Sequence, residues 1–156
     1  MSDAAARVLV VGVGHRDRGD DGAGPALADG VAALAPPGVD TLVTEGDLVG
    51  LLDAWAGCTR VVVVDATASG APTGTVRELD PAGPFRHATA TSSHGFGLAE
   101  TLALARALGR LPPEVRLLGI EGACYDVGAP LSEAVAAAAQ SLALRLALEE
   151  AAADGR

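Results

Sequence analysis

Two nearly unbroken apolar runs constrain the fold of this chain more than any other feature of its sequence. They are Arg7–Val13 (RVLVVGV) and Arg60–Asp65 (RVVVVD). A strand with one face in water alternates polar and apolar residues, whereas a strand covered on both faces is apolar throughout. Both runs therefore predict central strands of a parallel sheet that has helices on both of its faces.

The rest of the chain alternates between strand and helix patterns. The further predicted strands are Val39–Thr44, Val115–Ile120 and a weakly alternating edge strand, Thr75–Leu79. The predicted helices are Pro25–Leu34, Leu48–Trp55, Gly97–Leu108 and Leu131 to about Ala152, the last with Ser132 as its N-cap. Such alternation predicts an α/β class protein: a single-domain, three-layer α/β/α sandwich over residues 1–156, with a mainly parallel twisted sheet of about five strands. Residues 1–6 and 153–156 are expected to fray.

Charge and composition exclude several functions. The chain has 20 acidic and 11 basic residues, a net charge of −9, which argues against a nucleic-acid partner. All the basic residues are arginine, so a Schiff-base lysine and a phosphate-binding P-loop lysine are both impossible. Cys58 and Cys124 form no C-x-x-C pair, and neither a signal peptide nor a membrane-length apolar segment is recognisable. We therefore expect a cytoplasmic protein that does not contact the membrane.

Polar residues gather where the predicted strands end, and this is where open α/β sheets bind ligands. Asp20 and Asp21 follow the first strand, Asp65 ends the second apolar run, and His94 precedes a predicted helix. Two carboxylates and one imidazole are a suitable donor set for a divalent transition metal. A purely structural interpretation competes with this one: an aspartate would cap the following helix, and His94 would be a structural or surface histidine.

Other chemistries fit the residues less well. The loop Gly12–Gly22 has Asp17 where a dinucleotide-binding G-x-G-x-x-G motif needs glycine, and its two consecutive acids would repel a pyrophosphate. Cys124 is a candidate thiol nucleophile served by a histidine, although a lone cysteine is more often a small buried apolar residue. A non-enzymatic metal-binding or nucleotide-binding module also remains open as an alternative.

Four motifs in order, VLVVGVGHRDRGDDGAG, VVVVDA, SSHGFGL and LLGIEG, resemble those of the hydrogenase maturation proteases. These endopeptidases trim the C-terminus of [NiFe]-hydrogenase large subunits. The resemblance spans nearly the whole chain and implies a five-stranded twisted sheet flanked by helices. It also implies that Asp21, Asp65 and His94 form the metal-contacting and catalytic set, with Asp20 as the other acid of the family's pair.

The resemblance further implies how such an enzyme works. It would recognise nickel already inserted in the large-subunit precursor, its protein partner, and would need no permanent cofactor. We expect it to act as a monomer. One position departs from the family: His15 stands where asparagine is usual after the G-x-G turn. His15 would either replace part of the asparagine's role, add an imidazole ligand, or mark a related peptidase that acts on another protein.

Overall fold

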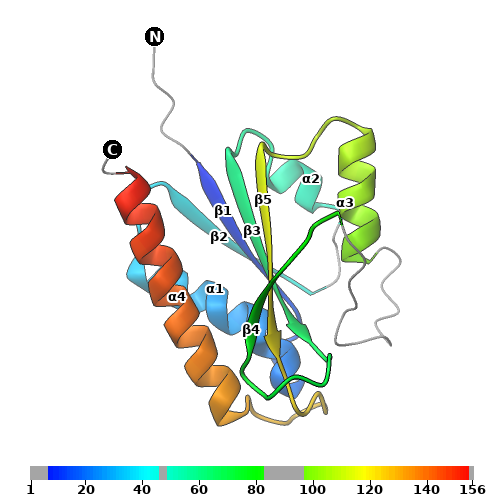
Figure 1. The fold of residues 1–156 in the computed structure, drawn as a ribbon, viewed down its shortest axis with the longest axis vertical. Coiled ribbons are helices and arrows are strands. Elements are labelled where there is room, and N and C mark those ends of the chain that lie inside the picture. Colours follow the sequence, from blue (N-terminus) through cyan, green and yellow to red (C-terminus); the bar gives the residue numbers. More distant parts are fainter. Residues whose placement is uncertain (1–6, 46–48, 83–96, 155–156) are drawn as a thin grey trace.

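The two apolar runs form the centre of a five-stranded sheet, as predicted. In the computed structural model, which describes residues 7–45, 49–82 and 97–154, the strand order is β2-β1-β3-β5-β4 (Figure 1). The strands are β1 (Val8–Val13), β2 (Val39–Thr44), β3 (Arg60–Thr67), β4 (Val76–Leu79) and β5 (Glu114–Glu121). All neighbouring strands are parallel except β4, which pairs antiparallel with β5 at the edge. The predicted edge strand is therefore confirmed.

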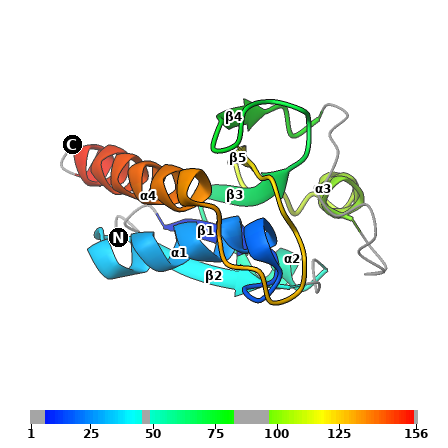
Figure 2. The ribbon, with the colours of Figure 1, turned by 90° about the horizontal axis from the view of Figure 1, so that it is seen from below.

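Helices cover both faces of this sheet. They are a short 3-10 helix, η1 (Gly19–Gly22), and the α-helices α1 (Ala23–Leu34), α2 (Leu51–Ala54), α3 (Leu98–Ala107) and α4 (Glu133–Asp154). Figure 2 shows α1 and α4 on one side of the sheet and α2 and α3 on the other. The predicted three-layer α/β/α arrangement is confirmed.

The valines of β3 explain why its sequence does not alternate. Val61 and Val63 pack into the core beneath α2 and α3, whereas Val62 and Val64 pack into the core beneath α1 and α4. Because successive side chains of a strand point to opposite faces, a sheet with two cores needs apolar residues at every position. All four valines are completely buried.

All four helices are found, but their boundaries differ from the prediction, most of all for α2 and for the end of α4. The helix expected over Leu48–Trp55 begins only at Leu51 and ends at Ala54, while its apolar face, including Trp55, is buried as expected. Gly50 directly precedes this short helix. Gly57 follows it with a left-handed φ of 80°, a conformation that a helix extended to this position could not contain. The last helix continues through Ala153 to Asp154, where we expected a frayed end. No helix in the described part of the chain is long and apolar enough to cross a membrane.

Helix α1 approaches the ends of β1 and β3 closely through Gly24. A Cβ atom at Gly24 would lie only 2.5 Å from the carbonyl oxygens of both Val13 and Val64. This close packing holds η1, which leads directly into α1, against the edge where the parallel strands end. The segments that carry Asp21 and Asp65 therefore meet at this carboxyl edge of the sheet.

Candidate functional site

Asp21 is held at the end of β1 by the residue in which the sequence departs from the family. Its Oδ2 accepts hydrogen bonds from the backbone N–H of His15 (2.8 Å) and, with Nδ1 protonated, from the His15 imidazole (2.9 Å). The Asp21 side chain is buried, and the turn is tight because a Cβ on Gly14 would lie 1.9 Å from the Asp21 carbonyl oxygen. No residue within the described ranges donates to Oδ1 of Asp21. One oxygen is thus fixed, and the other remains as a possible acceptor or ligand.

Asp20 has a different environment, although it is the next residue in the same turn. It is 0% exposed, and its Oδ2 accepts from the N–H groups of Ala123 (2.8 Å) and Cys124 (3.2 Å) and from the Ser132 hydroxyl (2.6 Å). Its Oδ1 accepts from the N–H of Ser132 (2.7 Å). Burial by itself raises the pKa of this carboxyl, but the hydrogen bonds outweigh burial and lower the pKa below its ordinary value. Asp20 therefore connects η1 to the segment between β5 and α4.

The helix-capping interpretation of the two aspartates is wrong. Neither η1 nor α1 has a side-chain hydrogen bond at its N-cap, because both carboxylates bind elsewhere. Ser132 does stand directly before α4, as predicted, but its hydroxyl donates to Asp20 across the structure. A local cap was the competing interpretation of Asp20, whereas in the folded chain Asp20 and Ser132 join distant segments.

Asp65 lies near the end of β3, at the same edge. Gly12, the next-to-last residue of β1, pairs with Val64 of β3. Asp65 follows Val64 and therefore lies level with the end of β1. The side chain is half-buried, and its Oδ1 accepts the N–H of Ala66 (2.8 Å). Asp65 follows Val61 and Val63 on the sheet face that α2 and α3 cover. The fold thus brings two of the three predicted carboxylate and imidazole groups to one edge.

The third predicted group, His94, lies outside the described residues. In the described ranges, no cluster of three or more histidine, cysteine, aspartate or glutamate side chains is spaced to hold a metal ion. The closest arrangement to such a cluster is the His15–Asp21 pair. Cys124 lies with its Sγ 3.5 Å from Oδ2 of Asp126, a carboxylate that cannot act as its histidine partner.

Glu121, at the end of β5, is a buried acid whose role the sequence reasoning missed. Its carboxylate accepts from the Thr67 hydroxyl (3.0 Å), from the N–H (2.8 Å) and hydroxyl (2.8 Å) of Ser69, and from the N–H of Gly70 (3.1 Å). Burial opposes ionisation, but these donors lower its pKa. Glu121 thereby fixes the loop that follows Asp65. The available signal was an acid directly after an apolar strand, the same pattern that singled out Asp65.

Tyr125 lies close to the carboxylate of Glu121. Its hydroxyl donates to the Thr67 carbonyl oxygen (2.7 Å). Burial and the neighbouring charge of Glu121 raise the pKa of Tyr125 to about 12, so the phenol is neutral at physiological pH. Tyr125 is therefore a hydrogen-bond donor that secures the end of β3, not an acid or base.

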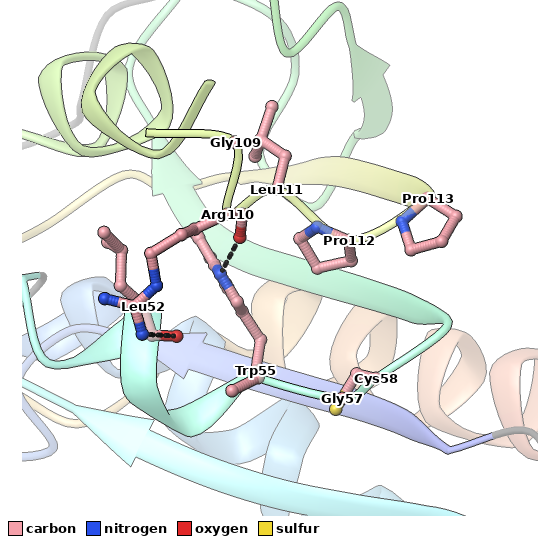
Figure 3. Close-up of a pocket in the computed structure, with 10 residues that line it drawn as sticks. Leu52, Trp55, Gly57, Cys58, Gly109, Arg110, Leu111, Pro112 and Pro113 are labelled. Carbon is pink, nitrogen blue, oxygen red and sulfur yellow. Dashed lines mark hydrogen bonds between the residues drawn. The ribbon is translucent and has the colours of Figure 1, made fainter. Parts of the chain in front are cut away.

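A cavity of about 280 Å³ lies at the opposite, amino edge of the sheet (Figure 3). It is bounded by the residues that lead into β3 and β5, among them Cys58 and Pro113, and by Trp55 and Arg110. The Trp55 indole donates to the Arg110 carbonyl oxygen (2.9 Å), which ties the α2 end to the α3–β5 turn. The cavity is thus remote from Asp21 and Asp65, at the wrong end of the strands for the predicted chemistry.

Comparison with known families points to the same proteins as the sequence motifs. A family model described as hydrogenase maturation protease (HycI) matches residues 44–150. This range includes Asp65 and His94, whereas Asp21 precedes it. No curated protein is significantly similar to the chain in sequence.

Solved structures resemble the chain along nearly its whole length. The [NiFe] hydrogenase maturation protease HycI from Thermococcus kodakarensis KOD1 is 26% identical, with a TM-score of 0.72, and the match covers 94% of this chain and 93% of that one. The hydrogenase maturating endopeptidase HybD from E. coli is also 26% identical, with a TM-score of 0.72 and coverage of 92% and 93%. HybD from Thermococcus kodakarensis is 27% identical, with a TM-score of 0.70 and coverage of 93% and 99%.

Proposed function

This chain belongs to the hydrogenase maturation protease family and is a peptidase, and we propose that it removes a C-terminal peptide from a nickel-loaded [NiFe]-hydrogenase large-subunit precursor. In this proposal the nickel is part of the substrate, the enzyme keeps no permanent cofactor, and Asp21, Asp65 and His94 recognise the metal. The enzyme acts as a monomer in the cytoplasm.

The observation that carries the proposal is the orientation of Asp21. His15 occupies Oδ2 with two hydrogen bonds, so Oδ1 is the oxygen that the described contacts leave for a ligand. Asp65 lies near the end of the neighbouring strand, β3, on the sheet face that α3 covers. Helix α3 begins at Leu98, four residues after His94 in the sequence. This arrangement supports a set of two carboxylates and one imidazole at a single edge.

A three-donor set is chemically suited to recognising a metal that another protein carries. Two carboxylates and one imidazole leave a nickel ion with open coordination positions, which groups of the precursor can fill. The metal and the carboxylates are then close to the substrate backbone, where a carboxylate can orient a water molecule toward the scissile carbonyl. His15 donates a hydrogen bond to Asp21 through Nδ1, so we assign His15 a positioning role for that carboxylate.

Processing of a purified precursor tests this function. The full-length chain is incubated with nickel-loaded and with nickel-free large subunit, and mass spectrometry follows release of the C-terminal peptide. We expect cleavage of the loaded form alone. Asp21→Asn, Asp65→Asn and His94→Ala should each slow it by about 100-fold or more, the usual size of an essential acid–base or metal contact.

Asp40→Asn is the matched control, because Asp40 is an exposed acid near the start of β2 that pairs with Arg7. It should cleave at the wild-type rate. Equal cleavage of loaded and nickel-free precursor would refute the metal recognition, and wild-type rates in all three site variants would refute the residue assignment. Cleavage of neither precursor would mean that the substrate is another protein. A Cys124→Ser variant should remain active, and its inactivity would favour the thiol mechanism instead.

A further inference from the structure

Two loops at the carboxyl edge are bonded to each other at several points. The first runs from Gly14 through η1 and carries Asp21, and the second is residues 122–132, between β5 and α4. Three backbone hydrogen bonds join them: Asp20 N–H to Cys124 O (2.7 Å), Gly19 N–H to Ala129 O (3.0 Å) and Gly128 N–H to Asp17 O (2.6 Å). These two loops therefore behave as one structural unit, although they are about 100 residues apart in the sequence.

The Asp20 carboxylate is at the centre of this unit. Its four hydrogen bonds, to Ala123, Cys124 and twice to Ser132, all cross from the first loop to the second. A buried carboxylate is tolerated only when such donors replace its hydration, and here both of its oxygens are engaged. Asp20 therefore has little capacity left for a metal, which distinguishes it from Asp21.

The two loops pack so closely that no side chain fits between them at Gly19 or Gly122. A Cβ on Gly19, whose φ is 56°, would lie 2.4 Å from the Cys124 carbonyl oxygen. A Cβ on Gly122 would lie 2.7 Å from the Cβ of Asp20. Asp20 and Asp21 are consecutive in η1, with the Asp21 N–H bonded to Arg18 O (3.1 Å), so a shift of one is passed to the other.

We propose that Asp20 is a positioning residue for the recognition of the substrate's metal: it fixes η1 on residues 122–132 and thereby orients the carboxylate of Asp21. This inference rests on the proposed function for its effect on cleavage, but its structural part stands independently. The backbone N–H of His15 donates to the Asp21 carboxylate, so the chemical shift of the His15 amide is sensitive to the position of that carboxylate. It can be measured without any substrate.

The test combines Asp20→Asn with nuclear magnetic resonance and kinetics on the full chain. Asparagine preserves the shape of the side chain but presents an NH₂ group to at least one of the N–H donors, so it breaks part of the contact without creating a cavity. The matched control is Glu150→Gln. Glu150 is an equally buried acid at 5% exposure, but it pairs with Arg60 at the start of β3, near the opposite edge.

We expect Asp20→Asn to shift the amide resonances of Ala123, Cys124 and Ser132 and also that of His15, and to lower kcat/KM for the precursor by about 10-fold or more. Glu150→Gln should leave the His15 resonance and the cleavage rate unchanged. An unchanged His15 resonance in Asp20→Asn would overturn the proposal, as would wild-type kcat/KM in a variant whose His15 resonance has moved.

Should Asp20→Asn not fold, Ser132→Ala removes one donor and is judged by the same two criteria. If the wild type cleaves no precursor, the proposed function fails, and the His15 resonance still decides the positioning role.

Discussion

Replacing Gly24 by alanine should destabilise the protein, although the same change stabilises most helices. Gly24 is the second residue of α1, and alanine is favoured over glycine in a helix by about 1 kcal/mol. Here the added methyl group would lie 2.5 Å from the carbonyl oxygens of Val13 and Val64 and 2.6 Å from the N of Val13. All three are backbone atoms of the central strands β1 and β3, which are held by hydrogen bonds to their neighbours in the sheet. We therefore expect the helix to move away and the sheet to keep its place.

The magnitude follows from the size of that movement. Ordinary contact distances of about 3.5 Å require α1 to retreat by about 1 Å, and a gap of that size removes a quarter to a half of the dispersion energy of the atoms that line it. A loss of that fraction from the fully buried α1 side chains Leu27 and Val31 amounts to about 1–3 kcal/mol in total, since each gains about 1.5–3 kcal/mol from burial. Residual strain adds about 1–3 kcal/mol. After the helix-propensity gain of about 1 kcal/mol is subtracted, a net loss of about 1–5 kcal/mol remains.

Urea unfolding followed by circular dichroism measures this loss, which corresponds to a Tm about 2–20 °C lower for a chain of this length. Ala33→Gly is the matched comparison, because Ala33 is an exposed residue of the same helix. There the methyl group is favourable, and its removal should cost about 1 kcal/mol. A Gly24→Ala variant as stable as the wild type would show that the contact between α1 and the strand ends is not close, and the reasoning about how η1 is held at this edge would fail with it.

Two further predictions concern the buried polar groups of the same edge. Because the pKa of Glu121 is lowered in the folded state, its contribution to stability is complete above pH 4.5, its ordinary pKa, and is lost as the pH falls through the lower folded value. Glu121→Gln should therefore be less stable than the wild type at neutral pH by about 2 kcal/mol, with a difference that shrinks in acid; a difference independent of pH would contradict the assignment. Tyr125, the only tyrosine, should be only about one-tenth ionised in the native protein midway between pH 10.0 and 12, and most of its phenolate absorbance should appear at once on unfolding in urea at that pH. Ionisation of the native protein near 10.0 would mean that the phenol is not buried against Thr67.

Most of the fold could be predicted from local patterns in the sequence. The unbroken valine run of β3 indicated a strand with a core on each face, and the alternation of strands with helices indicated parallel pairing. The length of helix α2 could not be predicted in this way. The apolar spacing around Leu51 and Trp55 indicates which face is buried, but it does not indicate how many residues are helical. The edge of the sheet at which Asp21 and Asp65 lie also followed from the sequence, since strand direction in an α/β sheet places all carboxyl ends together.

The candidate site was predictable in its residue types but not in its contacts. The motifs singled out Asp20, Asp21 and Asp65 alike as acids after apolar strands. Sequence reasoning also missed the role of Glu121, whose donors on Thr67 and Ser69 are 54 and 52 residues away. Periodicity and capping rules describe a few neighbouring residues, so they contain no information about donors that arrive from another loop.

The sequence by itself thus determined the layered α/β architecture, the edge where Asp21 and Asp65 lie and the family to which the chain belongs. Only the tertiary structure decided which donors surround each acid. Asp20 and Asp21 are chemically identical neighbours, but one is surrounded by donors from Ala123, Cys124 and Ser132, and the other keeps an oxygen that no described residue occupies. The physical reason is that the environment of a carboxylate depends on the donors that folding brings within about 3 Å, and those donors belong to segments more than 100 residues away.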